Sequence, residues 1–257
     1  MIAAGSQGGV PGKGPMDVSV VVPMHNERDG VAALFAALAL LNRRLGPRRS
    51  MEAVLVDDCS TDGTYDVAWP IAERAAFPAR VIRINPQEGI GGALRHGFFF
   101  AVGTTIVTYD ADLPYPIEDV LPMLDKIDAG ADVVTASPYH ESGRVEDVPA
   151  SRLWVSRLAS RIWRFRLGLG QGGIKTLSCG FRAYRKTVLL AHPHQSDGFL
   201  ATTELIVRPL RAGLRVEEIP SVLRKRATGR SKMKVARTAL AHLIFLLFRL
   251  PPKARKP

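Results

Sequence analysis

The sequence predicts an α/β protein with a mostly parallel central sheet that is covered by helices on both faces. Short, continuous apolar runs alternate along the chain with segments of helical periodicity, and most runs end in polar or glycine-rich residues. Apolar runs of this length form strands that are buried on both faces. Strands that alternate with helices build right-handed βαβ units, so we expect these runs to lie side by side in one sheet.

Five strands are expected in the first part of the chain, with helices between them. The predicted strands cover residues 18–23, 53–57, 80–84, 105–109 and 133–136. Helices are predicted from Val31 to about Arg44, from the turn at 58–64 to Ala76, and from the glycine-rich segment 88–95 through Val102. A further helix is expected from Pro116, because proline and acidic residues favour the first turn of a helix.

Polar clusters follow four of the predicted strands. In open α/β sheets the ligand lies outside the carboxyl ends of the strands. The clusters there are His25-Asn26-Glu27, Asp57-Asp58, the glycine loop with Gly91, and the pair Asp110 and Asp112. Their convergence predicts a binding site, in which the glycines fit a close approach to phosphate. Two alternatives remain open: Asp57 and Asp58 could satisfy the backbone amides of the following turn, and the glycine loop could be an ordinary helix entry.

Asp110 and Asp112 are candidates for holding a cation. If Asp110 still lies on extended backbone, the two-residue period of a strand turns both carboxylates to one side. Mg²⁺ and Mn²⁺ favour oxygen ligands, and Mg²⁺ is commonly held by one or two carboxylates plus substrate phosphates and waters. Taken alone, an Asp-x-Asp motif can also reflect turn chemistry.

The composition is that of a globular protein with a substantial core, since 46% of the 257 residues are hydrophobic and 23% are charged. Cys59 and Cys179 are too few for a disulfide framework and have no CxxC spacing, which favours a reducing compartment. Residues 1–16 are rich in glycine and lack the apolar core of a secretory signal. We therefore expect a disordered N-terminal tail.

The net charge of +11 is unevenly distributed. No acidic residue follows Glu218, whereas eleven lysines and arginines do, and residues 151–186 also contain no acid. Such blocks indicate an anionic partner, either nucleic acid or an acidic membrane surface. A solvated basic face is the alternative for any single block.

Five motifs occur in a characteristic order. They are Pro23-Met-His-Asn-Glu27, Val56-Asp-Asp-Cys-Ser-Thr-Asp-Gly-Thr64, Asp110-Ala-Asp112, Ser178-Cys-Gly-Phe-Arg-Ala-Tyr184 and Arg226-Ala-Thr-Gly-Arg-Ser-Lys232. The chain thereby resembles glycosyltransferase family 2, and within it the dolichol- or polyprenyl-phosphate mannose synthase branch. The resemblance implies a GT-A nucleotide-diphospho-sugar transferase fold. It places the catalytic domain at residues 17–233 and leaves 234–257 as a membrane-associating helix with a basic tail.

The resemblance also implies roles for individual residues. Nucleotide-sugar binding falls to Pro23, His25, Glu27, Asp57, Asp58, Gly91 and Asp110, together with Arg226 and Lys232 in a mobile loop that closes over the phosphates. The metal ligands would be Asp110 and Asp112, and the catalytic group Asp112, Arg226 and Lys232. Two positions depart from the family: His25 stands where tyrosine is usual, and Pro114 stands where many relatives have a polar metal ligand.

The expected chemistry is an inverting transfer. Departure of a nucleoside diphosphate builds negative charge, which a divalent cation stabilises with help from Arg226, Arg230 or Lys232. A phosphate monoester acceptor, with a second pKa of about 6, is largely dianionic and needs cations rather than a general base. The candidates for holding that phosphate are Arg144, Arg152, Ser156 and Arg157, and the resemblance adds Arg182. Glu204 has a plainer interpretation: it favours a helix N-terminus or pairs with Arg208.

Two segments indicate contact with a membrane. In residues 152–169, Trp154, Leu158, Ile162 and Phe165 recur at helical spacing beside a basic face, as in an interfacial helix. A core-packed helix with a solvated basic face is the alternative. Residues 235–250 are also apolar, but a spanning helix needs about 20 apolar residues. We therefore expect this segment to lie on the membrane surface or against a partner's helices, and we expect no span of its own.

The favoured function is metal-dependent transfer of a hexose, with mannose from GDP-mannose ahead of UDP-glucose, to a polyprenyl or dolichyl phosphate at the cytoplasmic membrane face. An integral membrane protein is a candidate partner. Another acceptor, such as a glycolipid or polysaccharide, is the second interpretation, although the QxxRW motif of processive synthases is absent. A membrane-surface adaptor on a retired transferase fold is the third. Nucleic acid is disfavoured, because aliphatic runs rather than stacking aromatics interrupt the basic blocks.

Overall fold

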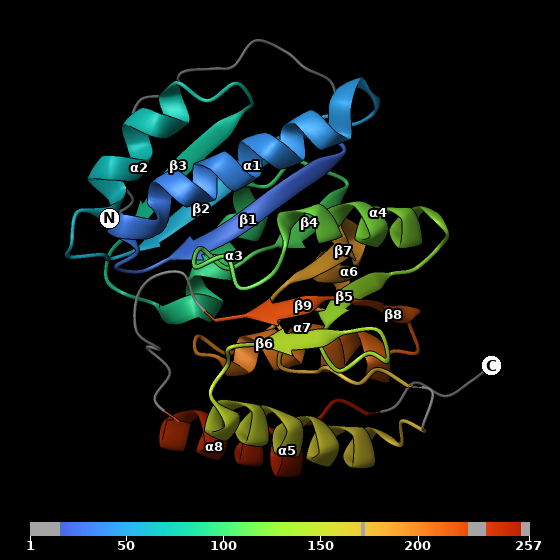
Figure 1. Cartoon of the computed structure of the whole chain (residues 1–257). Helices are drawn as coiled ribbons and strands as arrows, with labels where there is room; N and C mark the ends of the chain where they lie inside the picture. The colour runs from blue at the N-terminus through green and yellow to red at the C-terminus, as the bar shows by residue number, and fades with distance from the viewer. Residues whose placement is uncertain (1–15, 171–172, 226–234, 253–257) are drawn as a thin grey trace.

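A seven-stranded mixed sheet forms the centre of the protein (Figure 1), whose computed structural model describes residues 16–170, 173–225 and 235–252. Its strand order is β3-β2-β1-β4-β7-β5-β8. The strands are β1 (Val18–Met24), β2 (Met51–Asp58), β3 (Ala79–Ile84), β4 (Thr105–Thr108), β5 (Val133–Ser137), β7 (Arg182–Arg185) and β8 (Val216–Pro220). A separate parallel pair consists of β6 (Arg144–Glu146) and β9 (Val222–Arg224).

Most of the strand pairs are parallel, as the sequence predicts. β1 runs parallel to β2 and β4, β2 to β3, and β5 to β8, whereas β7 lies antiparallel between β4 and β5. Both faces of β1 are buried: Val20 and Val22 pack in the core on one side of the sheet, and Val21 packs on the other. Burial on both faces explains why β1 is a continuous apolar run.

Helices cover both faces of the sheet. α1 (Val31–Leu45), α2 (Thr64–Glu73) and α4 (Val120–Asp128) pack in one core, while α3 (Gly89–Phe100), α6 (Lys186–Ala191) and α7 (Leu200–Arg211) pack in the other. Short 3₁₀ helices occur at η1 (Arg28–Gly30), η2 (Gly46–Arg48) and η3 (Ile117–Asp119). Several predicted ends were too long: the strand expected to reach Tyr109 ends at Thr108, and the helix expected to reach Ala76 ends at Glu73.

A third core lies on the far side of α7, between α7 and the helices α5 (Ala150–Leu167) and α8 (Val235–Ile244). These two helices lie at the lower end of the molecule in Figure 1, and α8 continues into the π-helix η4 (Phe245–Arg249). The indole N–H of Trp163 donates to Nδ1 of His242 at 3.1 Å, and the ring of Trp163 packs 5.6 Å from that of Phe245. Among the described helices, none has the length and apolar character needed to cross a bilayer.

Some expectations fall outside the described residues. They concern the N-terminal tail up to residue 15, the loop residues Arg226, Arg230 and Lys232, and the basic end of the chain from Lys253. The backbone of Arg152 lies in α5, but its side chain is not among those described.

Candidate active site

The ends of β1, β2 and β4 meet at one edge of the sheet. Met24 is the register partner of Asp57, and Val21 is the partner of Thr108, so the residues that follow these strands come together. The Nδ1–H of His25 donates to the carbonyl oxygen of Asp58 at 2.7 Å. The sequence prediction that the polar clusters after these strands converge is therefore consistent with the geometry.

Asp57 is the most unusual side chain at this edge. It is fully buried, and neither carboxylate oxygen has a well-formed hydrogen bond within the described part of the chain. The guanidinium of Arg83 forms an ion pair with it, in which Nε lies 3.6 Å from Oδ2. Burial raises the pKa of this carboxyl, while the polar groups of Ser60 and the charge of Arg83 oppose that shift. Since buried polar atoms are rarely left without partners, Asp57 offers two acceptors that fit a ligand's N–H groups.

Asp58 has a different role from its neighbour. Its two carboxylate oxygens accept the backbone N–H groups of Glu88 at 2.7 Å and of Gly89 at 2.8 Å. The carboxylate thus ties the end of β2 to the loop that leads into α3. The expectation that these aspartates satisfy backbone amides holds for Asp58, although the amides belong to the next loop. At Asp57 the hydroxyl and the N–H of Ser60, in the following turn, face the carboxylate without forming well-aligned hydrogen bonds.

Asp110 and Asp112 lie in a turn rather than on a strand. The N–H of Leu113 donates to the carbonyl oxygen of Asp110 at 3.2 Å, which closes a turn directly after β4. The two-residue period of a strand therefore does not relate the two carboxylates, and that condition of the prediction is not met. Asp112 is buried, and Asp110 is partly buried against Gly180, where an added Cβ would lie 3.1 Å from Oδ1 of Asp110.

These two aspartates are a donor set that fits a hard divalent cation. Within the described residues, no group of three or more His, Cys, Asp or Glu side chains forms a metal cluster. Pro114, two residues after Asp112, cannot coordinate a cation through its side chain. Two carboxylates completed by water and a ligand's phosphates suit Mg²⁺, which usually keeps several waters.

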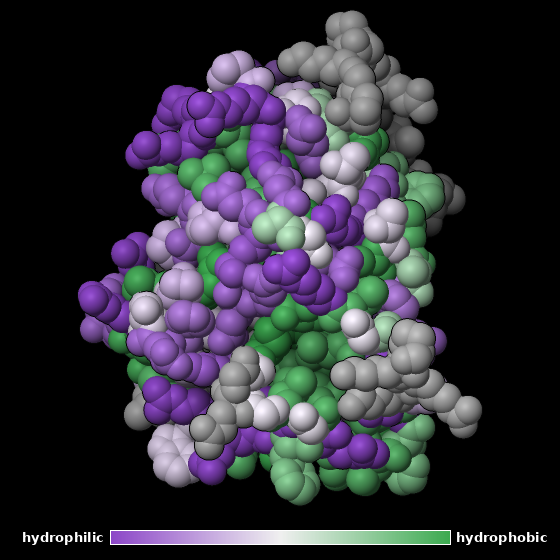
Figure 2. All heavy atoms as spheres, turned by 90° about the vertical axis from the view of Figure 1, so that its right-hand side faces the viewer, coloured by the Kyte–Doolittle hydropathy of each residue, from purple (hydrophilic) through white to green (hydrophobic). Residues whose placement is uncertain are grey.

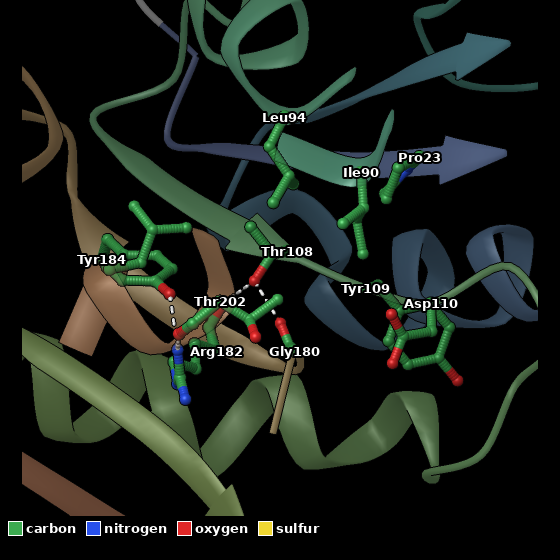
Figure 3. A pocket seen from close by; sticks show the side chains of 11 residues that line it. Pro23, Ile90, Leu94, Thr108, Tyr109, Asp110, Gly180, Arg182, Tyr184 and Thr202 are labelled. Atoms are coloured by element: carbon green, nitrogen blue, oxygen red, sulfur yellow. Dashed lines mark hydrogen bonds between the residues drawn. The ribbon is translucent and has the colours of Figure 1, made fainter. Parts of the chain in front are cut away.

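A small pocket lies beside Asp110 (Figure 3). Its lining residues come from β1, β4, β7, α3 and α7, and they are Pro23, Ile90, Leu94, Thr108, Tyr109, Asp110, Gly180, Arg182, Tyr184, Thr202 and Leu205. Thr108 fixes one wall, because its hydroxyl donates to the carbonyl oxygen of Gly180. Pro23, near the end of β1, lines this pocket.

Arg182 forms part of that wall, and its guanidinium is already engaged. The side chain is fully buried and donates to the carbonyl oxygens of Leu177, at 2.9 Å, and Thr202, and to Oγ1 of Thr135 at 3.2 Å. The predicted role in holding an acceptor phosphate is corrected here, because these contacts use the guanidinium to join β7, β5 and α7. A buried arginine is tolerated because its donors are satisfied in this way.

Gly91 packs closely against the backbone of the loop before α7. Its N–H donates to the carbonyl oxygen of Asp197 at 2.6 Å, and an added Cβ would lie 2.0 Å from the carbonyl oxygen of Ser196. This N–H is therefore not available to a phosphate, which corrects the predicted role of Gly91. Glu204 organises the same loop: it accepts the N–H of Ser196 and pairs with Arg208 at 2.9 Å, and the predicted i,i+4 pair is confirmed.

The remaining acceptor candidates are spread over two elements. Arg144 is exposed on β6, whereas Arg157 lies on α5 with its guanidinium 5.3 Å from the ring centroid of Tyr139. On the same helix, the hydroxyl of Ser156 lies 3.0 Å from that of Ser178. The structure therefore brings Ser156 and Arg157 onto one helix and leaves Arg144 on a separate strand.

Arg83 and Gly180 contribute to the site, and the sequence reasoning missed both. Arg83 is the register partner of Asp57 in the neighbouring strand. Aligning the ends of these two predicted strands could have identified it. Gly180 had no local signal beyond the motif around it, because its role depends on Asp110 lying opposite.

Comparison with known proteins agrees with this geometry. The glycosyl transferase family 2 model matches residues 19–191. The chain is 32% identical over 219 residues to a dolichol-phosphate mannosyltransferase of Pyrococcus furiosus, with 85% of this chain and 60% of that protein aligned. It is 31% identical over 220 residues to a polyprenol monophosphomannose synthase of Mycolicibacterium smegmatis, with 83% and 80% aligned. The chain thus spans less than two thirds of the Pyrococcus relative.

A solved structure supports the fold. The glucosyl-3-phosphoglycerate synthase of Mycobacterium tuberculosis, in complex with Mn²⁺, uridine diphosphate and phosphoglyceric acid, superposes with a TM-score of 0.67 at 21% identity, over 90% of this chain and 78% of that one. The likeness is one of fold, and it confirms the predicted GT-A architecture. From the match over most of its length and from its relatives, the chain belongs to glycosyl transferase family 2.

Proposed function

We propose that this protein transfers a hexose from a nucleotide sugar to a polyprenyl or dolichyl phosphate, with inversion at the anomeric carbon. The observation that carries the proposal is the match of the chain to two relatives named for lipid-phosphate mannosyl transfer. The match covers the strand ends that hold Asp57, Asp110 and Asp112. Those names favour mannose as the sugar, and the branch that the motifs resemble favours GDP-mannose as the donor.

In this proposal the nucleotide binds at the ends of β1 and β2. The oxygens of Asp57, which have no well-formed hydrogen bond among the described residues, accept N–H groups of the base. His25 and Glu27 border the nucleotide from the segment after β1. Asp58 acts indirectly, since its contacts to Glu88 and Gly89 hold the loop beside that pocket. A guanine offers two neighbouring N–H donors to a carboxylate, which is one reason to favour a guanosine nucleotide.

Asp110 and Asp112 would hold a divalent cation, Mg²⁺ or Mn²⁺, on the diphosphate. When bound, the cation neutralises the charge that develops on the leaving diphosphate. The turn after β4 positions the two carboxylates, and Gly180 leaves room for Asp110. Arg226 and Lys232 remain proposed partners of the same phosphates, with Asp112 in the catalytic group.

The acceptor phosphate would approach from the side of α5 and β6. Arg144, Arg152, Ser156 and Arg157 are the proposed groups that hold it, and the phosphate itself is the nucleophile. Because a phosphate monoester is largely dianionic at neutral pH, attack needs no general base. Direct displacement of the diphosphate inverts the configuration of the sugar.

The lipid acceptor requires the protein to lie on a membrane, and we propose that α5 and α8 make this contact at the cytoplasmic face. On α5, Trp154 is 75% exposed and Phe165 is 90% exposed; on α8 and η4, Leu243 and Phe248 are exposed as well. Figure 2 shows apolar side chains at the lower end of the molecule, where α5 and α8 lie in Figure 1. Exposed apolar faces of this kind, flanked by arginines, are typical of interfacial helices.

The experiment that tests this function uses the full chain, Mn²⁺ or Mg²⁺, a polyprenyl phosphate and a panel of radiolabelled nucleotide sugars that includes GDP-mannose and UDP-glucose. Label is counted in the organic phase, with EDTA as the control for the cation. We expect label from GDP-mannose that EDTA abolishes. No label from any donor, in a preparation that binds a nucleotide sugar, contradicts a lipid phosphate as the acceptor.

A further inference from the structure

A second pocket lies between α5 and the loop that follows β5. It has a volume of about 420 Å³ and shares no lining residue with the pocket beside Asp110. Its lining residues are Pro138, Tyr139, His140, Arg157, Ser160, Arg161, Arg164 and Lys175. The nucleotide and metal sites do not account for this basic pocket.

The charge of the pocket is strongly positive. Three arginines and a lysine line it, and the acidic side chain that pairs with one of them is Glu141, which lies 3.2 Å from Lys175 and is 88% exposed. Arg164 donates to the carbonyl oxygen of Gly170, and among the described residues Arg161 has no ion-pair partner. Such an excess of cations in one hollow favours an anionic ligand.

Ser160 provides an independent reason to expect a ligand. Its side chain is only 4% exposed, it lines the pocket, and its hydroxyl has no hydrogen-bond partner within the described residues. A buried hydroxyl without a partner costs free energy. Its hydroxyl oxygen is itself covered in the fold, so an anionic oxygen would accept this hydrogen bond only after the neighbouring side chains turn aside.

The helix places this pocket next to an exposed apolar face. Arg157, Arg161 and Arg164 are four and three residues apart, so they lie on one face of α5. The exposed side chains Trp154 and Phe165 belong to the neighbouring face. A ligand that bears both phosphate and hydrocarbon matches the two faces together.

We propose that this pocket binds the phosphate of an anionic phospholipid headgroup, while the acyl chains of that lipid run along the apolar face of α5. This inference rests on the membrane contact in the proposed function and adds a headgroup site that borders the proposed acceptor site and shares Arg157 with it. The bound lipid would fix the orientation of α5 on the bilayer, and with it the orientation of Arg157 toward an incoming acceptor.

The first test is flotation with vesicles of phosphatidylcholine, with and without phosphatidylglycerol. Arg161→Gln/Arg164→Gln removes two charges from the pocket, and Arg43→Gln/Arg44→Gln removes two exposed charges from α1 as the matched control. For vesicles with phosphatidylglycerol, we expect the partition coefficient of the pocket variant to fall about fivefold for each arginine that is removed. The control should partition like the unmodified protein. Equal losses in both variants overturn the proposal, because they show a general charge effect.

The second test separates a pocket from a merely charged surface. Ser160→Ala changes no charge and removes a hydroxyl that has no partner in the part of the chain that the structure describes, so the melting temperature should stay the same or rise. If the hydroxyl binds the headgroup, binding to vesicles with phosphatidylglycerol falls severalfold while binding to pure phosphatidylcholine is unchanged. Unchanged binding to both vesicles overturns the pocket, even if the arginine variant is weakened.

Two further probes identify the source of the phosphate. Binding that requires polyprenyl phosphate in the vesicles, and not phosphatidylglycerol, assigns the pocket to the acceptor and overturns a separate headgroup site. Inorganic phosphate and glycerol phosphate are then compared as competitors for vesicle binding. If inorganic phosphate displaces the protein from the vesicles as effectively as glycerol phosphate, the pocket does not select a headgroup and that part of the proposal is overturned. Vesicle binding needs no sugar donor, so a failure of transfer in the unmodified protein counts against the proposed function alone.

Discussion

Asp57 and Arg83 face each other across the parallel strands β2 and β3, where they are register partners and Nε of Arg83 lies 3.6 Å from Oδ2 of Asp57. The carboxylate is fully buried, whereas the arginine side chain is 46% exposed and also lies over the ring of Tyr65. The partly exposed Arg83 stabilises the charge of the buried carboxylate, and the carboxylate oxygens can still accept hydrogen bonds from a ligand. This relationship leads to the first prediction.

Nucleotide binding should weaken in acid at a higher pH than an ordinary aspartate would impose. Burial raises the pKa of Asp57, so the folded chain takes up this proton at a higher pH than the unfolded chain. As the pH rises, ionisation of Asp57 therefore lowers the free energy of unfolding. As the pH falls, protonation of Asp57 removes the acceptor for the ligand's N–H, and binding weakens. Calorimetric titration with a nucleoside diphosphate across the acid range measures this loss of affinity, which is the acid limb of the pH profile.

Two variants check the assignment of that limb. Arg83→Gln removes the nearby positive charge that lowers the pKa, so the acid limb should move to a higher pH. Asp57→Asn removes the titrating group and should abolish the limb. An identical acid limb in the unmodified protein and in Asp57→Asn would contradict the role of Asp57.

Asp58→Asn should destabilise the fold. The carboxylate is buried and accepts two backbone N–H groups, and an asparagine offers one oxygen and an amide that faces a donor. Loss of one hydrogen bond to a charged group costs about 1.5–3 kcal/mol. Urea unfolding measures the change, with Glu73→Gln, an exposed acid on α2, as the control. An equal free energy of unfolding in both variants would show that Asp58 does not hold the α3 loop.

Gly91→Ala should displace the loop at Ser196 and Asp197. The added methyl group would lie 2.0 Å from a backbone carbonyl oxygen, which cannot move as a flexible side chain does. We expect a loss of about 1–3 kcal/mol in the free energy of unfolding, as for an overpacked core. Gly198→Ala, in the same loop, is the control, because its methyl group would meet nothing within 4 Å in the described parts of the chain. Thermal unfolding that treats both variants alike would refute the close approach.

Gly180→Ala should weaken cation binding more than it affects the fold. Its methyl group would lie 3.1 Å from Oδ1 of Asp110, so the carboxylate must shift by a few tenths of an ångström. Mn²⁺ binding in the presence of a nucleoside diphosphate, followed by electron paramagnetic resonance, should fall severalfold. Gly170→Ala, whose methyl group would meet no described residue within 4 Å, is the control. Unchanged Mn²⁺ affinity in Gly180→Ala means that Asp110 is not a ligand.

The parallel part of the fold was predictable because its signals are local. β1 and β2 are apolar runs that are buried on both faces, and parallel pairing brings the residues after them to one edge. The antiparallel strand β7 was not predicted, because it is a four-residue segment with an arginine at each end. Its burial depends on β4 and β5, which flank it in the sheet but lie far away in the sequence.

The site was predictable as a set of strand ends, but not residue by residue. Asp57 and Asp58 are adjacent and look equivalent in sequence, yet only Asp58 meets the backbone of the α3 loop. Gly91 and Arg182 have plausible functional patterns, but their partners come from segments about a hundred and about twenty residues away. Tertiary contacts of this kind decide which polar groups stay available to a ligand, and no local pattern encodes them.

The most direct test of the proposed function is a transfer assay that compares polyprenyl phosphate with the unphosphorylated polyprenol, using labelled GDP-mannose and Mn²⁺, for the unmodified protein and Asp112→Asn. We predict labelled lipid only when the acceptor carries its phosphate, and at least a hundredfold less, roughly the loss of a preorganised electrostatic group, in Asp112→Asn. Equal labelling of both acceptors, or undiminished transfer by Asp112→Asn, would contradict a metal-assisted attack by a lipid phosphate.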